Sequence, residues 1–257
     1  MKTLVALDPK YMTVTYGAGG STKDGTRKAL QHALTQFDIP MGSHLTFLST
    51  TKPDLNDYID TLWDMGVKHI VALRGDLPAG KQFSDFDNEQ LYYKFTSNFV
   101  EALLKRHPFE ISVGAYPEKH PDAPSLEADI EALRLKCDAG ATRAITQFFF
   151  DNDIYYRFLD QVQKTGITTP ICPGLLPIHD FNGMKNFAAK CNTTIPQWLE
   201  ETFNNLDDNP AEAQKRATEI LIKQTEDLVK NGVEHIHYYT LNKAGITKEA
   251  CEALKGL

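Results

Sequence analysis

The sequence has few of the features that mark secreted or membrane proteins. It contains only four cysteines, which are scattered and form no C-x-x-C pair, at Cys137, Cys172, Cys191 and Cys251. This spacing argues against a structural zinc site or a disulfide framework and fits a reducing compartment. There is no run of about 18 apolar residues and no signal peptide, so we expect a cytoplasmic protein.

The chain also lacks an excess of positive charge. It has 27 Lys and Arg against 34 Asp and Glu, which gives a net charge of -7. This balance argues against nucleic acid or an anionic membrane surface as a partner. At 257 residues and 42% hydrophobic content, the chain can bury a substantial core. Because no linker, low-complexity tract or repeat interrupts it, we predict a single domain over residues 1–257.

Short apolar runs alternate with longer amphipathic segments along the chain. The runs that predict strands are Tyr11–Tyr16, His44–Leu48, His69–Arg74, Glu110–Tyr116, Arg143–Phe148, Pro170–Leu175 and His235–Thr240. The segments that predict helices are Thr22–Gln36, Pro53–Met65, Asp87–Lys105, Ser125–Ala139, Asn152–Lys164, Phe181–Lys190 and Ala211–Lys230. This alternation indicates an α/β fold with parallel strands joined by helical crossovers.

The number of strands bears on the kind of α/β fold. A closed (β/α)8 TIM barrel has eight strands, and the sequence predicts seven. Residues 2–9 read as the last turns of a helix that leads into the strand at Tyr11. We therefore predict a barrel whose first strand and part of whose first helix are missing from this chain. A doubly wound open sheet, which needs no eighth strand, is the alternative.

Polar residues follow many of the predicted strands, which favours the barrel. The run from His69 to Pro78 ends in Arg74-Gly75-Asp76, a polar turn directly after a buried strand. In a β/α protein, ligands meet catalytic groups at that end of the strand. Taken singly, such residues have ordinary explanations, since Asp76 and Arg74 could form a structural ion pair.

The other strand ends leave the same choice open. His44 could be a core histidine with its hydrogen bonds satisfied, and Gln147 could bond within the barrel. Tyr116 could pack with its hydroxyl group at the rim, and residues 148–150 could be core or wall. The functional interpretation rests on the coincidence that five strands, including the first with Thr15, place polar residues at the same end.

The loop from Gly17 to Thr22 follows a strand and precedes a helix. Its backbone N–H groups could hold an anion. It matches neither the G-x-G-x-x-G pattern nor the P-loop pattern, however. An ordinary tight turn explains it equally well.

Together these motifs resemble those of methylenetetrahydrofolate reductase, in the family's order and over nearly the whole chain. They are Val14-Thr-Tyr-Gly-Ala18, His44-Leu-Thr46, the run from His69 to Pro78, Ala115-Tyr-Pro-Glu-Lys-His-Pro121, the run from Arg143 to Phe150 and Tyr238-Tyr-Thr-Leu-Asn242. The resemblance implies a flavoprotein barrel that reduces 5,10-methylenetetrahydrofolate to 5-methyltetrahydrofolate. FAD is the implied cofactor, and NADH or NADPH is the implied co-substrate. The resemblance also implies a homo-oligomer.

The resemblance further implies roles for individual residues. Asp76 and Gln147 are the implied catalytic residues, and both would also bind the folate. The implied FAD contacts are Thr15, His44, Leu73, Arg74, Gly75, Tyr116, His120, Asp129 and Lys136. The remaining implied substrate contacts are Phe187, Tyr239 and Leu241. No carboxylate and histidine set has metal-ligand spacing, so we expect no metal site.

Two other classes of function remain as alternatives. The chain could be a flavin- or folate-binding barrel protein without catalysis. It could also be an unrelated barrel enzyme such as an aldolase or lyase, although no lysine stands at a predicted strand end as a Schiff-base nucleophile. A bound yellow chromophore would argue against this second alternative.

The sequence departs from the family's pattern at its general acid. Reduction requires a proton donor at the folate amine, and in the family a glutamate in an E-F-F-P-P segment on the first strand fills this role. That segment does not occur in these 257 residues, and Glu118 has no evident geometry for replacing it. Because both this acid and the first barrel strand are missing from the sequence, we predict severely impaired turnover and stability for this chain. Near-normal turnover of methylenetetrahydrofolate by the purified chain would contradict the prediction.

Overall fold

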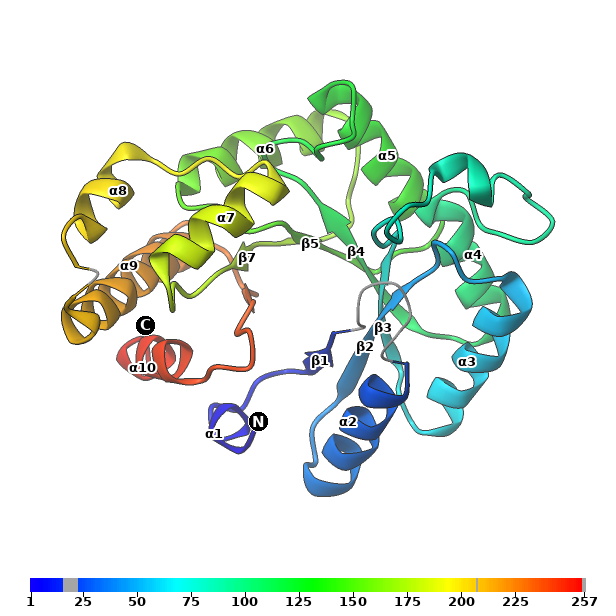
Figure 1. Ribbon diagram of the computed structural model, residues 1–257, viewed down its shortest axis with the longest axis horizontal. Coiled ribbons are helices and arrows are strands. Elements are labelled where there is room, and N and C mark those ends of the chain that lie inside the picture. Colours follow the sequence, from blue (N-terminus) through cyan, green and yellow to red (C-terminus); the bar gives the residue numbers. More distant parts are fainter. Residues whose placement is uncertain (16–22, 207, 256–257) are drawn as a thin grey trace. The chain divides into compact units, whose positions relative to one another are not determined.

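The computed structural model describes residues 1–15, 23–206 and 208–255 of the chain (Figure 1). The predicted turn from Gly17 to Thr22 lies outside these residues, as does Tyr16. The contacts divide the chain into two compact units. We call residues 9–114 with 133–144 the N-terminal unit, and residues 1–8, 115–132 and 145–257 the C-terminal unit.

The N-terminal unit is built from parallel strands that alternate with helices. Its strands are β1 (Met12–Val14), β2 (Met41–Thr46), β3 (His69–Leu73) and β4 (Glu110–Ala115), whose last residue belongs to the other unit. Its helices are α2 (Lys23–Gln36), α3 (Lys52–Asp64), the 3₁₀ turn η2 (Phe83–Phe86) and α4 (Thr96–Arg106). The register opposes Val14 to Ser43 and Thr46 to Leu73.

The C-terminal unit continues the alternation with shorter strands. It shares α5 (Leu126–Asp138) and β5 (Arg143–Thr146) with the N-terminal unit. Its own strands are β6 (Ile171–Cys172), β7 (Gly174–Leu175) and β8 (His237–Tyr238). Its own helices are α1 (Lys2–Val5), α6 (Asn152–Lys164), α7 (Phe181–Cys191), α8 (Gln197–Phe203), α9 (Pro210–Lys230) and α10 (Gly245–Ala253).

Strand order confirms the predicted α/β fold. Strands β1 to β6 form one sheet in which the order in space is the order in the chain, while β7 pairs in parallel with β8. A doubly wound sheet reverses its strand order at a switch point. The described strands β1 to β6 contain no such reversal, so the doubly wound alternative does not match this topology.

The prediction of a helix over Asp87–Lys105 is wrong in its first half, because the helix begins only at Thr96. Asn88 forms a local turn instead. Its side chain accepts a hydrogen bond from the N–H of Gln90, and its carbonyl oxygen accepts from Leu91 and Tyr92. Side-chain bonds of this kind compete with the helix.

The predicted strand Pro170–Leu175 is divided in two. Pro173 has no N–H group for a ladder, and its carbonyl oxygen accepts a hydrogen bond from His237 at 2.9 Å. The adjacent N–H group of Gly174 bonds instead to the hydroxyl group of Thr146. The sequence prediction also missed α8 and α10, which are short.

Each unit has its own apolar core. In the N-terminal unit, the face of α3 that carries Leu55, Ile59 and Leu62 is fully buried, and so is Phe99 of α4. In the C-terminal unit, Phe148, Phe149 and Phe150 are 2%, 0% and 5% exposed and belong to one core cluster. This burial confirms the interpretation of residues 148–150 as core. Among the described residues, no helix combines the length and the apolar character needed to cross a membrane.

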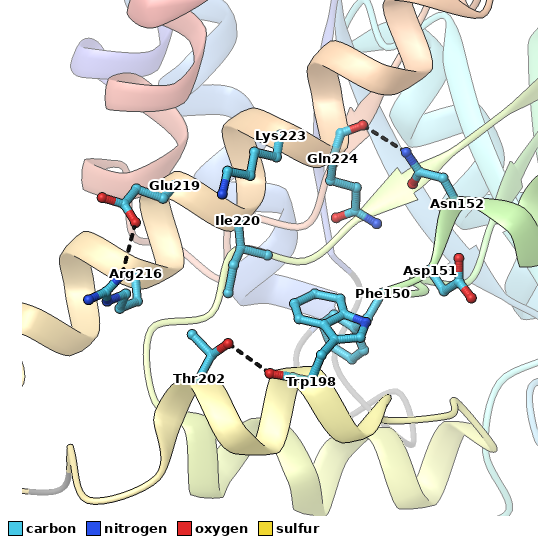
Figure 2. A pocket seen from close by; sticks show the side chains of 10 residues that line it. All are labelled: Phe150, Asp151, Asn152, Trp198, Thr202, Arg216, Glu219, Ile220, Lys223 and Gln224. Atoms are coloured by element: carbon cyan, nitrogen blue, oxygen red, sulfur yellow. Dashed lines mark hydrogen bonds and ion pairs between the residues drawn. The ribbon is translucent and has the colours of Figure 1, made fainter.

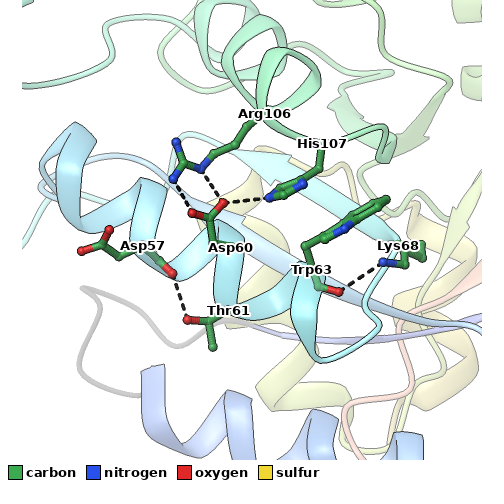
Figure 3. A network of polar contacts seen from close by, with 7 residues as sticks. All are labelled: Asp57, Asp60, Thr61, Trp63, Lys68, Arg106 and His107. Carbon is green, nitrogen blue, oxygen red and sulfur yellow. Dashed lines mark hydrogen bonds and ion pairs between the residues drawn. The ribbon is translucent and has the colours of Figure 1, made fainter.

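A polar network joins α3 to the end of α4 (Figure 3). The Asp60 carboxylate accepts hydrogen bonds from the guanidinium group of Arg106 and from Nε2 of His107, the latter at 2.7 Å. The His107 ring stacks on Trp63 with 4.8 Å between centroids, and the Lys68 ammonium group lies 3.2 Å from the centroid of the Trp63 ring. The hydrogen bond from Arg106, then that from His107, lowers the pKa of Asp60 from 3.8 to about 2.

We predict that Asp60→Asn lowers the thermal midpoint at neutral pH and that the loss shrinks in acid. A carboxyl group whose pKa is lowered by folding stabilises the protein above its unfolded pKa. That contribution is lost as the pH falls through the folded pKa. The gap between wild type and variant should therefore narrow from about pH 4 towards pH 2.

Melting curves at several pH values test this prediction. Asp64→Asn is the control, because Asp64 is exposed near the end of the same helix and takes no part in the network of Figure 3. A gap for Asp60→Asn that is constant across the pH range would contradict the role given to the network.

Candidate functional site

Several of the predicted site residues lie at the carboxyl ends of neighbouring strands in the N-terminal unit. Thr15 directly follows β1, His44 lies in β2, and Leu73 and Arg74 stand at the end of β3. Because β1, β2 and β3 are parallel and in register, these ends lie along one edge of the sheet. The structure thus brings the predicted residues of these three strands together.

His44 is half-buried and bonded within the sheet. One of its ring nitrogens, Nε2, lies 3.2 Å from the hydroxyl group of Thr13 on the neighbouring strand. Thr15 is exposed, and its carbonyl oxygen accepts a hydrogen bond from Thr26 of α2 at 3.0 Å. The first contact joins β1 to β2, and the second joins the end of β1 to α2.

The turn after β3 is held closely against β2. The carbonyl oxygen of Arg74 accepts a hydrogen bond from the N–H group of Leu48 at 2.9 Å. The guanidinium group of Arg74 lies over the ring of Phe83, 4.8 Å from its centroid. Gly75 has a φ of +91°, and a Cβ atom there would meet Cβ of Thr46 at 2.8 Å. This turn needs a glycine for both reasons, and it leaves Asp76 exposed.

Lys136 supplies a second cation at a strand end of the N-terminal unit. It lies in the last turn of α5 and is half-buried. Its ammonium group donates a hydrogen bond to the carbonyl oxygen of Gly114 at 2.6 Å. This bond anchors the lysine at the end of β4.

In the C-terminal unit, the segment after β4 is bonded to α5. The buried carboxylate of Asp129 accepts a hydrogen bond from the backbone N–H of His120 at 2.7 Å. The ring of His120 packs edge-on against Tyr116, with 4.5 Å between centroids. Nδ1 of His120 accepts a hydrogen bond from the N–H group of Asp122, so the neutral ring carries its proton on Nε2.

Glu118 is engaged in the structure of this unit. Both of its carboxylate oxygens accept from the backbone N–H of Thr194, at 3.1 and 3.0 Å. Its carbonyl oxygen accepts from the side chain of Asn192. The carboxylate thus holds the segment after α7 to the segment after β4.

Gln147 follows β5 and is half-buried. Its backbone N–H donates to Ala115 at 2.8 Å, and its side-chain oxygen accepts from the N–H of Phe148 at 3.1 Å. Phe187 of α7 packs against Phe148 with 5.1 Å between ring centroids, and it remains 39% exposed. The side chain of Phe187 therefore has one packed face and one surface open to a ligand.

Tyr239 and Leu241 follow β8. The hydroxyl group of Tyr239 donates to the carbonyl oxygen of Thr146 at 2.7 Å, and its ring lies where Gly174 leaves room. Leu241 and Asn242 both have positive φ angles, of 48° and 61°, and Leu241 is 57% exposed. An exposed leucine on a left-handed turn is unusual enough to mark a candidate contact.

The sequence prediction missed His179, which lies between β7 and α7. Burial and then the nearby charge of Lys243 lower its pKa. Its Nε2 atom is buried and has no hydrogen-bond partner among the described residues. In the sequence, the signal that could have identified His179 is its position directly after the apolar run 174–178. No group of three His, Cys, Asp or Glu residues in the described ranges could hold a metal ion.

We predict that Gly75→Ala destabilises the protein more than Gly80→Ala does. Both glycines have positive φ, but a Cβ at Gly80 meets nothing within 4 Å. The shared backbone strain costs about 1 kcal/mol, and the collision with Thr46 adds ~1–3 kcal/mol. The thermal midpoint of Gly75→Ala should be lower by about 2–4 °C for each additional kcal/mol. Equal midpoints for the two variants would contradict the tight packing of this turn.

Comparison with known proteins gives a consistent result. The family model for methylenetetrahydrofolate reductase matches residues 1–255. The 5,10-methylenetetrahydrofolate reductase of Escherichia coli is 38% identical over 251 residues, which are 98% of this chain and 82% of that protein. Methylenetetrahydrofolate reductase (NADH) 1 of Zea mays is 30% identical in an alignment of 253 positions, which covers 94% of this chain and 42% of that protein.

A solved structure shares the fold. It is an uncharacterized protein from Clostridium thermocellum described as binding two copies of 5-methyl-5,6,7,8-tetrahydrofolic acid, with a TM-score of 0.50 and 17% identity. The match covers 98% of this chain and 96% of that one. The family model and the sequence relatives establish more than the fold, and the chain belongs to the methylenetetrahydrofolate reductase family.

Proposed function

We propose that the chain reduces 5,10-methylenetetrahydrofolate to 5-methyltetrahydrofolate with FAD as its cofactor and NADH or NADPH as the electron donor. The observation that carries the proposal is the family match over residues 1–255 together with the polar residues at successive strand ends. The name of the Zea mays relative, which contains NADH, supports a nicotinamide nucleotide as the donor.

The residues of the N-terminal unit fit the phosphate and sugar parts of FAD. Arg74 and Lys136 are cations suited to a diphosphate, and Thr15 and His44 add polar atoms at the ends of β1 and β2. Gly75 supports the fit because its missing Cβ lets the turn approach Thr46 closely. Leu73 would add apolar contact at the end of β3.

In the C-terminal unit, the proposed cofactor contacts are a hydrogen-bond donor and an aromatic ring. Nε2–H of His120 can donate a hydrogen bond, and Tyr116 beside it offers a ring and a hydroxyl group. We propose that Asp129 acts mainly by holding the backbone of His120 in place, since one carboxylate oxygen is engaged there. Bound FAD would supply the carrier for two electrons between the nicotinamide and the folate.

The folate would be held by side chains that are exposed or half-buried in the structure. Asp76 offers an exposed carboxylate to the pterin, and the amide of Gln147 can both donate and accept. Phe187, Tyr239 and Leu241 would provide apolar contact for the rest of the molecule. Lining of this type, apolar with a few polar groups, is common in ligand sites.

We also propose that residues 1–257 form one domain with the (β/α)8 barrel fold. The sequential order of β1 to β6 supports this, because a barrel is wound in one direction. The alternative function, flavin or folate binding without catalysis, uses the same residues. It differs in what happens after flavin reduction.

The proposal is tested on the purified chain. A yellow protein whose extracted chromophore is FAD would support the cofactor, and anaerobic bleaching by NADH or NADPH would identify the donor. Addition of methylenetetrahydrofolate should then restore the absorbance, at the impaired rate predicted from the sequence, and produce 5-methyltetrahydrofolate. Bleaching without that recovery would favour the non-catalytic alternative, and a colourless protein that binds no added FAD would overturn the proposal.

We predict that Asp76→Asn lowers the folate-dependent step by about 10- to 100-fold, as expected for the loss of a hydrogen bond to a charged group worth ~1.5–3 kcal/mol. Bleaching by NADH or NADPH should persist. Asp87→Asn is the matched control, an exposed carboxyl group farther along the same connection. Equal folate-dependent rates for the two variants would exclude the role proposed for Asp76.

A further inference from the structure

A pocket of about 390 Å³ lies in the C-terminal unit, and none of the site residues predicted from the sequence lines it. Figure 2 shows α8 on one side of it, α9 on the other and the start of α6 at one end. Its volume falls in the range of small-molecule sites, which is about 300–1,000 Å³. Because every lining residue belongs to one compact unit, the pocket is a property of that unit alone.

The apolar part of the pocket is aromatic. Trp198 of α8 is 44% exposed, whereas Phe150 beside it is 5% exposed and belongs to the core. Ile220 of α9 lies across from the indole ring (Figure 2). An exposed tryptophan above a buried aromatic residue offers a ring face on which a planar ligand can stack.

The charged side chains that line the pocket have hydrogen-bond or ion-pair partners except at one position. The guanidinium group of Arg216 pairs with Glu212 at 2.8 Å and with Glu219 at 3.6 Å. The Asp151 carboxylate accepts from the N–H group of Asp153 and caps α6. Lys223 is exposed and has no ion pair with the described residues, so it is the cation left for a ligand.

The other tryptophan of the chain, Trp63, has partners within the protein on its indole ring. Trp63 carries the His107 ring on its face and the Lys68 ammonium group at 3.2 Å from its ring centroid. Trp198 has neither a stacked ring nor a cation over its face among the described residues. The Trp198 face and the Lys223 charge are therefore both unmatched at the same pocket.

We propose that this pocket binds a planar aromatic ring that bears one carboxylate or phosphate group. The ring would stack on Trp198 and contact Ile220, and the anionic group would pair with Lys223. The side chain of Gln224 also lines the pocket, and its amide nitrogen donates a hydrogen bond to the carbonyl oxygen of Phe149. None of the residues that line this pocket is among the strand-end residues proposed for reduction.

The test uses ¹⁹F NMR of the full chain labelled with 5-fluorotryptophan. The chain has two tryptophans, so the spectrum should contain two signals, which Trp63→Phe and Trp198→Phe assign. Benzoate and phenyl phosphate are the probes, and they distinguish a carboxylate from a phosphate ligand. Benzamide and acetate supply the ring and the anion separately.

We expect at least one of the two anionic aromatic probes to shift the Trp198 signal saturably while the Trp63 signal stays fixed. Benzamide and acetate should bind at least about tenfold more weakly, because each lacks one of the two interactions. Lys223→Gln should weaken binding of the effective probe by about tenfold. Lys215→Gln, an exposed lysine of α9 outside the pocket, should leave it unchanged.

Three outcomes would overturn the proposal. They are an unmoved Trp198 signal with both anionic probes, an unchanged affinity in Lys223→Gln, and a Trp198 signal that follows protein concentration in place of probe concentration. The last result would mean that a second copy of the chain covers the pocket.

Discussion

The parallel pairing of β2 with β3 is the constraint on which the N-terminal unit and its candidate site both depend. The register that opposes Thr46 to Leu73 buries Leu45 and Ala72. The same register places Gly75 over Thr46 and so sets the direction of the turn that carries Arg74 and Asp76. Since side chains alternate between the two faces of a strand, and both faces are buried here, a slip of one residue would exchange the two buried sets of side chains and displace the turn together.

Much of this fold could be predicted from the sequence because its strands are short, buried apolar runs. The helix Asn152–Lys164 was predicted at both ends, since Asp151 caps it and its apolar face is regular. Prediction failed where a side chain or an imino acid changed the backbone locally. Asn88 turned the start of a predicted helix, and Pro173 divided a predicted strand. Both effects depend on the chemistry of one residue, the side-chain oxygen of Asn88 and the missing N–H group of Pro173. The hydrophobic periodicity of the sequence does not report either one.

The residues of the candidate site could be predicted from the sequence, but the hydrogen bonds that they form could not. The resemblance named Asp129 and His120, and the structure adds that the carboxylate of one holds the backbone of the other. Glu118 was considered as a proton donor, yet its partner is a backbone N–H group 76 residues away. His179 escaped notice because its burial arises from tertiary packing. The role of a residue depends on its hydrogen-bond partners, and partners that are distant in the sequence can be identified only from the structure.

The two tryptophans show why residue type alone does not identify a ligand site. Both lie on helices, Trp63 in α3 and Trp198 in α8, and residue type alone would describe them alike. In α3 the fold completes the arrangement internally, because His107 and Lys68 occupy the two interactions that an indole ring favours. In α8 the opposite wall stands across a pocket, and the corresponding partners are absent from the described residues. The same chemistry that stabilises one helix pair therefore remains available to a ligand at the other.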